Sequence, residues 1–423
     1  MKKFKARLLD FGKKHHWAMI ALRKARNIKQ KIRFWRCSFG AKTDSKLVVF
    51  ESFMGRSYSD NPRAIFEAML EDKKLKEYKF VWAFKKAATK IKTLPELEKM
   101  VDAGKVKVVS YGSKAYYKAM ASAKLVVSNS RIPECVKFRK DQKYVQTWHG
   151  TPLKKLGFDV THDTAMNTTK DIQDKHTESV KKYDYFISPS KFCSEKFESA
   201  FHLKEIAPKC RLLEIGYPRN DYLLNYKKAD LEDIKNKLGL NDKKFKKKQI
   251  ILYAPTWRDD QHESGKGYVY DCPVNFEKLR KELGDDYIIL FRAHYFVANS
   301  FDFSKYKDFV IDVSRYENIA ELFVISDILI TDYSSVFFDY SILKRPIILY
   351  MYDYDHYVGD LRGFYFDPSH LPWPIVKTEE ALIDAIRSSK PAMNEFAKQF
   401  IELEDGKASK RLIKELRKDG VVE

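Results

Sequence analysis

Short apolar runs alternate with helix-like stretches along nearly the whole of this 423-residue chain. The runs consist mostly of Val, Ile, Leu, Phe and Tyr and have the length of buried strands. Strands are predicted at residues 46–50, 78–84, 106–110, 124–128, 144–148, 183–188, 249–253, 287–292, 309–313, 327–331 and 346–350. Because strands that alternate with helices indicate βαβ units, the expected fold class is α/β with parallel sheets.

The length of the chain favours two domains with separate cores over one. The turn-rich stretch Gly216-Tyr-Pro-Arg-Asn-Asp interrupts the alternation, so we expect the boundary within residues 205–225. We predict a basic leader at 1–40, a first doubly wound domain at 41–215, and a second at 216–423 that includes C-terminal helices. Ligands of open α/β sheets bind beyond the carboxyl ends of the strands, so the two domains should face a central cleft.

The net charge of +21 is concentrated at the amino terminus. Residues 1–40 hold thirteen Lys and Arg against a single acid and thus supply +12. An amphipathic helix here would suit an anionic membrane surface, although a solvated arm or an RNA contact fits the charge as well. No signal peptide and no membrane-spanning segment is expected. The apolar residues that share one helical face are Trp17, Ala21, Ile28, Ile32 and Trp35.

The five cysteines are widely separated and show no spacing typical of a zinc site or a disulfide framework. A reducing compartment fits this usage. The chain also lacks a Gly-rich phosphate loop, a Gly-x-Ser-x-Gly elbow and a His-Glu-x-x-His motif. We therefore expect neither a bound metal nor a resident cofactor.

Two histidines follow predicted strands, one in each half of the chain. His149 comes after residues 144–148, and His294 comes after residues 288–292. Gly150 and Pro152 are expected to force a tight turn beside His149. A histidine fixed at such a point is suited to acid–base chemistry near neutral pH, although a lone histidine is often structural. If both domains meet at one cleft, the two imidazoles can approach the same ligand.

The segment Asp327-Ile-Leu-Ile-Thr-Asp332-Tyr-Ser334-Ser335 ends a predicted strand and opens a predicted helix. Free backbone N–H groups at a helix start favour anions, and two hydroxyls add further donors. The simpler interpretation is that one serine only caps the helix. Asp339 lies one turn inside, where it could accept hydrogen bonds from ligand hydroxyls.

Several arginines also follow strands or turns: Arg219, Arg258 and Arg292. A guanidinium binds phosphate through a planar pair of N–H groups. Any one of these side chains alone would be interpreted as a surface charge. Their shared position above the proposed sheet edges favours a phosphate site.

Five motifs together resemble the CDP-glycerol glycerophosphotransferase family, whose members prime or polymerise teichoic acids and related polymers. The motifs occur in the order Trp148-His-Gly-Thr-Pro-Leu-Lys-Lys-Leu, Gly216-Tyr-Pro-Arg-Asn-Asp, Tyr253-Ala-Pro-Thr-Trp-Arg, Arg292-Ala-His and Thr331-Asp-Tyr-Ser-Ser-Val-Phe-Phe-Asp. The resemblance covers residues 45–390 and implies a GT-B-like fold. It also implies that the first domain binds the acceptor and the second holds most of the CDP donor.

The resemblance further implies roles for individual residues. His149 would be the base that deprotonates the acceptor hydroxyl, and His294 would join Arg292 at the pyrophosphate. The other positions implied to bind substrate are Gly150, Thr151, Pro152, Arg219, Thr256, Trp257, Arg258, Asp332, Ser334, Ser335 and Asp339.

The expected reaction transfers glycerol phosphate from CDP-glycerol to a hydroxyl of a membrane-linked polyol-phosphate acceptor and releases CMP. The enzyme would work peripherally at the cytoplasmic face of the cell membrane, with an anionic lipid surface as partner and no nucleic acid. Two related activities stay open: ribitol phosphate transfer from CDP-ribitol, and sugar transfer from a nucleoside diphosphate sugar on the same fold. A non-catalytic basic protein that binds membranes or RNA is a third alternative.

Overall fold

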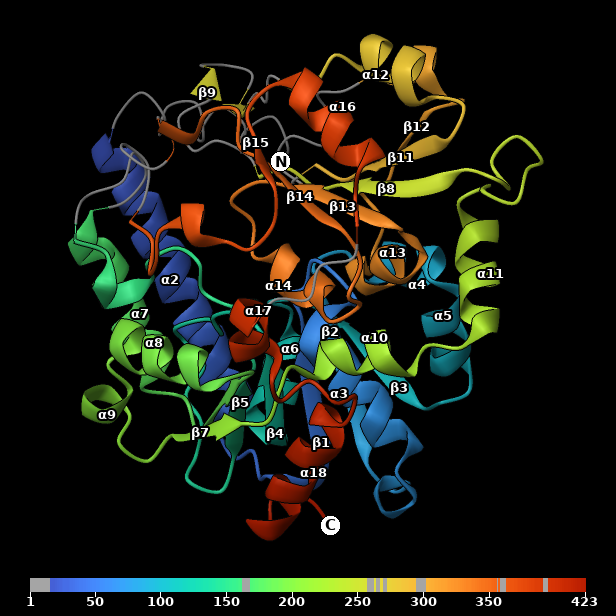
Figure 1. The fold of residues 1–423 in the computed structure, drawn as a ribbon. Coiled ribbons are helices and arrows are strands. Elements are labelled where there is room, and N and C mark those ends of the chain that lie inside the picture. The colour runs from blue at the N-terminus through green and yellow to red at the C-terminus, as the bar shows by residue number, and fades with distance from the viewer. Residues whose placement is uncertain are drawn as a thin grey trace.

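A computed structural model describes residues 16–161, 168–256, 262–263, 267–268, 272–293, 302–355, 357, 363–390 and 395–423. Two parallel α/β sheets lie one above the other, and helix α14 lies between them (Figure 1). Every strand predicted from the sequence is present, and the fold class is confirmed.

The lower sheet has seven parallel strands in the order β3-β2-β1-β4-β5-β6-β7. The order reverses between β1 and β4, and a crevice opens beside such a point at the carboxyl ends of the strands. The strand bounds are β1 Asp44–Glu51, β2 Lys79–Phe84, β3 Val106–Ser110, β4 Ala123–Ser128, β5 Lys143–Gln146, β6 Tyr185–Ser188 and β7 Arg211–Glu214.

Helices cover both faces of this sheet because its strand residues are buried on both sides. Phe50 packs into one core layer with Phe66 of α3, whereas its neighbour Val49 packs into the other with Tyr116 of α6. The helices of this domain are α3 Asp60–Glu71, α4 Ala87–Thr93, α5 Pro95–Asp102, α6 Lys114–Ser122, α7 Thr169–Val180, α8 Lys191–Phe201 and α9 Leu203–Ile206, with 3-10 turns η1 Lys73–Leu75 and η2 Gly157–Asp159.

The upper sheet has six parallel strands in the order β12-β11-β8-β13-β14-β15. Their bounds are β8 Gln249–Tyr253, β11 Tyr287–Phe291, β12 Val310–Asp312, β13 Ile328–Thr331, β14 Ile347–Tyr350 and β15 Ile375–Val376; a small antiparallel pair joins β9 His262–Glu263 and β10 Gly267–Tyr268. The surrounding helices are α11 Lys228–Lys237, α12 Phe276–Leu283, α13 Ile319–Ile325, α14 Val336–Ser341, α16 Glu379–Arg387 and α17 Glu395–Ile401, with η4 Ser304–Tyr306 and η5 Pro368–His370.

The chain crosses between the domains more than once. It leaves the lower domain after β7 through η3 Pro218–Asn220 and α10 Asp221–Asn225, and it returns with the last helix, α18 Ala408–Lys418 (Figure 1). Asp221 caps α18 by accepting from the backbone N–H groups of Ala408 at 2.7 Å and Ser409 at 2.8 Å. Leu412 and Leu416 then pack in the core of the lower domain. The expectation that residues 216–423 form one block must therefore be corrected, because α18 belongs by its packing to the first domain.

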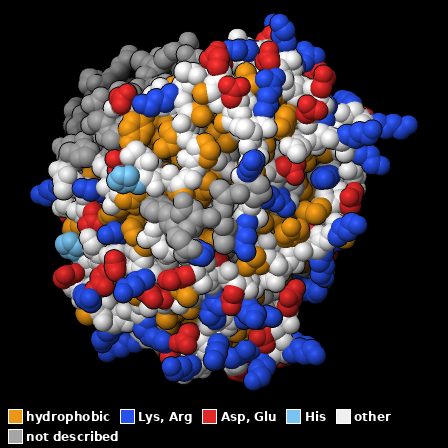
Figure 2. All heavy atoms as spheres, in the orientation of Figure 1, with side chains coloured by type: hydrophobic (Ala, Val, Ile, Leu, Met, Phe, Trp, Pro, Cys, Tyr) orange, Lys and Arg blue, Asp and Glu red, His pale blue; other side chains and the backbone are white. Residues whose placement is uncertain are grey.

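Helix α2, His16–Ser38, runs along the flank of the lower domain (Figure 1). It packs against α6 through Phe34 and Cys37, which are buried, and Arg33 donates to the Gly112 carbonyl at 2.8 Å. No helix among the described residues combines the length and apolarity needed to cross a bilayer. Away from α2, Lys and Arg side chains are interspersed with Asp and Glu on the face shown in Figure 2.

Candidate active site between the two domains

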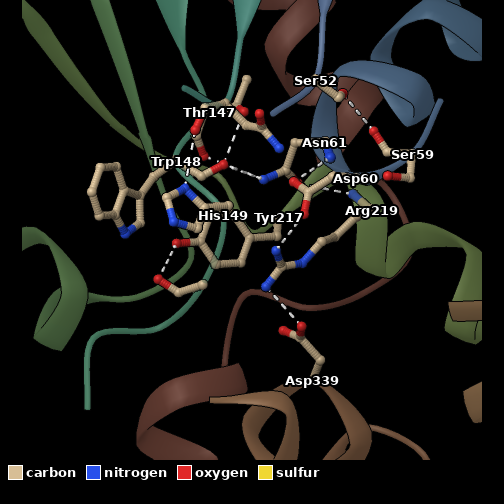
Figure 3. Close-up of polar contacts among 12 residues, drawn as sticks. Ser52, Ser59, Asp60, Asn61, Thr147, Trp148, His149, Tyr217, Arg219 and Asp339 are labelled. Atoms are coloured by element: carbon tan, nitrogen blue, oxygen red, sulfur yellow. Dashed lines mark hydrogen bonds and ion pairs between the residues drawn. The ribbon is translucent and has the colours of Figure 1, made fainter. Parts of the chain in front are cut away.

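A backbone turn with a left-handed residue positions His149 after β5. Trp148 has φ +51°, a conformation that a bulky residue adopts only when its surroundings enforce it. The side-chain amide of Asn61 donates to the carbonyl oxygens of Thr147 and Trp148, both at 3.2 Å (Figure 3). The indole of Trp148 is held edge-on against Phe201. The left-handed residue of the turn is thus Trp148, two positions before Gly150, and the turn is held by packing and hydrogen bonds.

Gly150 lies where the two domains approach each other closely. A Cβ atom at this position would lie 2.9 Å from the Ser335 hydroxyl oxygen of the upper domain. Beyond it, Thr151 and Pro152 are buried, and the segment pairs with the upper domain through Lys155 N–H, which donates to the Gly363 carbonyl at 2.8 Å. The motif that follows His149 therefore joins the two domains.

The imidazole of His149 has a defined tautomer. Its Nδ1 lies 3.0 Å from the backbone oxygen of Asn129, which can only accept, so Nδ1 carries the proton and Nε2 keeps a free lone pair. The ring is exposed toward the cleft but crowded by protein on its other sides. This desolvation lowers the pKa of His149 below its ordinary value, against the opposing effect of Asp60. At neutral pH the side chain is a neutral base with an available nitrogen.

A buried ion-pair triad crosses the domain boundary next to His149 (Figure 3). Arg219 donates to Asp60 of the lower domain at 2.9 Å and to Asp339 of the upper domain at 2.7 Å. Its guanidinium also lies over the ring of Tyr217, whose hydroxyl donates to the Gly150 carbonyl at 3.0 Å. Burial raises the pKa of Asp339, although Arg219 opposes this effect. Because Arg219 is committed to two carboxylates, its charge primarily joins the domains.

Arg292 is a cation of a different kind. It follows β11 and donates to two backbone oxygens, those of Val313 at 3.1 Å and Tyr316 at 2.8 Å. Within the described part of the chain, no carboxylate lies at ion-pair distance from it. Burial lowers the pKa of Arg292 to about 10, so it is still charged at neutral pH. A desolvated guanidinium without a carboxylate partner is suited to an anionic ligand.

The remaining predicted residues of the upper domain differ in whether hydrogen bonds hold their side chains. Asp332 is buried and accepts from both the backbone N–H and the hydroxyl of Thr256, at 2.8 and 2.7 Å, so this pair holds the loop after β8. Ser335 precedes α14 and makes no side-chain capping bond. The hydroxyl of Ser334 accepts weakly from the Val336 N–H at 3.5 Å. Trp257, Arg258 and His294 lie outside the described residues.

Some of these predicted residues border one cavity of about 220 Å³, which we call the interdomain cavity. Both domains contribute to it, as a site between two facing sheets requires. Among the predicted residues, His149, Arg219, Arg292, Ser335 and Asp339 line it, whereas Thr151, Pro152, Thr256, Asp332 and Ser334 do not.

Sequence reasoning missed several residues that shape this cavity. The sequence patterns assign no role to Phe53, Asp60, Asn129 or Glu317. Asn129 holds His149 through its carbonyl and accepts from the Phe53 N–H at 2.8 Å through its side chain. Glu317 forms an ion pair with Lys90 of the lower domain at 2.7 Å. The available signal was that Phe53 and Asn129 follow the ends of β1 and β4, beside the reversal of strand order.

Comparison with known proteins decides the family. The sequence model of CDP-Glycerol:Poly(glycerophosphate) glycerophosphotransferases matches residues 33–418. The chain belongs to this family. The resemblance inferred from five motifs is thereby confirmed, together with the prediction of a transferase.

Individual relatives agree with this assignment. The chain is 41% identical over 379 residues to the teichoic acid glycerol-phosphate transferase of Staphylococcus aureus, covering 87% of this chain and 92% of that protein. It is 40% identical over 386 residues to the teichoic acid poly(glycerol phosphate) polymerase of Staphylococcus epidermidis, covering 88% of this chain but only 51% of that protein. The chain therefore spans about half the length of that longer relative.

A solved structure of a variant of the wall teichoic acid polymerase TagF has the same two-domain fold. It matches with a TM-score of 0.81 and 37% identity, over 94% of this chain and 97% of that chain. A second variant of TagF was soaked with CDPG and matches with a TM-score of 0.79. The predicted GT-B-like architecture of two facing domains is confirmed.

Proposed function

We propose that this protein transfers glycerol phosphate from CDP-glycerol to the terminal hydroxyl of a membrane-linked polyol-phosphate acceptor, with release of CMP. One observation carries the proposal: a free imidazole nitrogen and a desolvated arginine border the same cavity between two family-typical domains. A base and an anion site that border the same cavity suit the transfer of a phosphoryl group to a hydroxyl.

In the proposed reaction, Nε2 of His149 takes the proton of the acceptor hydroxyl. The oxygen then bonds to the β-phosphorus of CDP-glycerol, and the bond from that phosphorus to the bridging oxygen breaks with its electrons leaving on CMP. Arg292 and the Ser335 hydroxyl neutralise charge that builds on the transferred group. The contribution of His294 to this site stays a prediction. Phosphoryl transfer depends mainly on such alignment and charge neutralisation.

Glycerol is the favoured polyol. The chain is 40–41% identical to relatives named as glycerol-phosphate polymerases or transferases, 31% identical to the glycerol-phosphate primase of Bacillus subtilis, and 27–30% identical to the ribitol-phosphate relatives. Purified protein given a lipid-linked acceptor should release CMP from CDP-glycerol much faster than from CDP-ribitol, and should not consume UDP-sugars. Preferential use of CDP-ribitol would contradict the assignment.

We also propose a peripheral location on the cytoplasmic face of the membrane, and helix α2 supports the contact with an anionic lipid surface. Ile28, Ile32, Trp35 and Phe39 recur at helical spacing and are all exposed, with Trp35 62% and Phe39 79% accessible. The positions between them are rich in Lys and Arg, which attract anionic headgroups. Replacing Ile28, Ile32 and Trp35 by Ser should abolish co-sedimentation with phosphatidylglycerol vesicles. Retained co-sedimentation would remove α2 as the membrane contact.

A further inference from the structure

A second cavity, of about 350 Å³, lies entirely within the lower domain on the other side of His149. We call it the basic cavity. The side chains of Phe53 and His149 line both this cavity and the interdomain cavity, so the two cavities meet at these residues. The proposed base therefore faces two spaces, of which the reaction described above has used one.

The loops that build the basic cavity follow the carboxyl ends of β1 and β4, and helix α7 closes it. Arg56 comes from the first loop, Arg131 from the second, and Lys175 from α7. Arg131 follows Asn129, the residue that holds His149, by only two positions. The cations are thus placed by the same backbone that positions the base.

The charge of this cavity has one sign. Its charged lining residues are the three cations Arg56, Arg131 and Lys175, and none of the described residues that line it is Asp or Glu. Arg131 forms no ion pair or hydrogen bond within the described part of the chain. The interdomain cavity, by contrast, contains Asp60, Asp339 and Glu317 beside its arginines. A cavity whose charged lining residues are all basic favours an anionic ligand.

A polar atom at this cavity also lacks a partner. The Nδ1 atom of His176, on α7, is buried and has no hydrogen bond among the described residues. A buried polar atom costs free energy unless a partner satisfies it. Burial, with Arg131 and Lys175 nearby, lowers the pKa of His176 to about 4, so its ring is neutral at neutral pH. His176 therefore adds no charge to the cavity, whose charged lining residues are Arg56, Arg131 and Lys175.

The basic cavity continues toward helix α2. An adjoining cavity of about 320 Å³ shares Met54, Arg131 and Lys175 with it and is also lined by Arg26 and Lys31 of α2. Two glutamates, Glu134 and Glu178, also line this adjoining cavity, but cations are in excess along the path from the helix proposed to meet the membrane to the proposed base. This is the direction in which a lipid-linked acceptor would have to extend.

We propose that the basic cavity binds the acceptor, with Arg131 and Lys175 on its last phosphodiester groups and its terminal hydroxyl at His149. This inference rests on the proposed function, since it names the site of the second substrate. The ligand class is a phosphodiester-linked polyol. Arg131 and Lys175 are binding residues here, because they face the acceptor and not the reacting phosphorus.

The test uses the full chain and a soluble trimer of glycerol phosphate as the probe. Arg131→Gln and Lys175→Gln should each weaken calorimetric binding of the trimer about tenfold, and the double variant about 100-fold, because each removes a hydrogen bond to a charged group. The KM for the trimer should rise in parallel, with the Kd of CDP-glycerol unchanged. Lys170→Gln is the matched control, an exposed lysine on the same helix α7 that lines neither cavity.

Unchanged trimer affinity in the double variant would overturn the inference. Loss of binding to phosphatidylglycerol vesicles with intact trimer affinity would also overturn it, by assigning these cations to lipid headgroups. If the wild type bound the trimer through Arg131 and Lys175 but transferred nothing from CDP-glycerol, the proposed function would be wrong. The assignment of the basic cavity as a binding site for the trimer would still hold.

Discussion

The two cavities that meet at His149 hold their positive charge in opposite ways. In the interdomain cavity Arg219 and Arg292 are withdrawn from solvent and fixed by ion pairs or backbone carbonyls. In the basic cavity Arg131 and Lys175 are exposed. Fixed, desolvated charges act strongly on a transition state because they need no reorganisation. Exposed charges bind more weakly and exchange readily, which suits a polymer that must advance after each addition.

The largest expected effect is the loss of folding stability when the ion-pair triad that joins the domains is broken. Arg219→Gln leaves Asp60 and Asp339 buried without their shared cation, which should cost about 3–5 kcal/mol. Urea unfolding monitored by circular dichroism measures this loss. Arg211→Gln is the matched control, because Arg211 also pairs with two carboxylates, Glu415 and Asp419, but is 40% exposed.

That surface variant should lose no more than about 1 kcal/mol. Similar losses of unfolding free energy in both variants would show that the buried ion pairs between the domains stabilise the fold no more than the ion pairs on the surface.

The next largest effect concerns charge neutralisation at the donor. Arg292→Gln should lower kcat/KM for CDP-glycerol by about 10²–10³, the range found when a preorganised donor to a developing anion is removed. Steady-state kinetics at saturating acceptor provide the measurement. Arg280→Gln, an exposed arginine of the same domain that pairs with Asp308, should leave the rate unchanged. A variant at Arg292 with normal kcat/KM would exclude this guanidinium from the donor site.

A smaller effect is expected from salt, which should raise the KM of the substrate in the basic cavity more than the KM of CDP-glycerol. Exposed charges are screened once the Debye length falls to a few ångström, whereas buried ones are affected much less. Raising NaCl from about 0.05 to 0.5 M should therefore increase the KM of the soluble trimer several-fold while the KM of CDP-glycerol changes less. Equal sensitivity of both substrates would contradict the contrast between fixed and exposed cations.

The smallest expected effect is on pH dependence. Because desolvation lowers the pKa of His149, the unprotonated base should persist to lower pH than an ordinary histidine allows. The kcat/KM for the acceptor should stay constant from pH 8 to below about 6.5, and then fall about tenfold per unit as the ring becomes protonated. Calorimetric affinity for CDP-glycerol should not follow this curve, because Arg292 stays charged throughout. A midpoint above pH 7 would contradict the assigned environment.

Local sequence patterns predicted the strands well because burial on both faces makes them short and continuously apolar. The runs 106–110 and 249–253 match β3 and β8 residue for residue. Besides the short pair β9 and β10, two strands of the parallel sheets were missed. Arg211-Leu-Leu-Glu214 has charged ends at a sheet edge, and Ile375-Val376 is only two residues long. Neither offers a periodic signal.

The site was predicted less completely, since its key contacts join distant parts of the chain. The position of Arg219 after a turn was visible in the sequence, but its ion pairs with Asp60 and Asp339, 159 and 120 residues away, were not. Gly150 was assigned to a turn, whereas its role is to admit Ser335. The return of α18 to the first domain could not be predicted either, because the apolar face of a helix does not specify which core it joins. Long-range packing decided each of these cases.

The most direct test of His149 as the base that serves both cavities compares chemistry with binding in one variant. His149→Ala should reduce transfer of glycerol phosphate to the trimer by about 10²–10⁴. Its calorimetric Kd values for CDP-glycerol and for the trimer should stay within about threefold of wild type, because the imidazole supplies neither anion site. Transfer at the wild-type rate would contradict the assignment of His149 as the base.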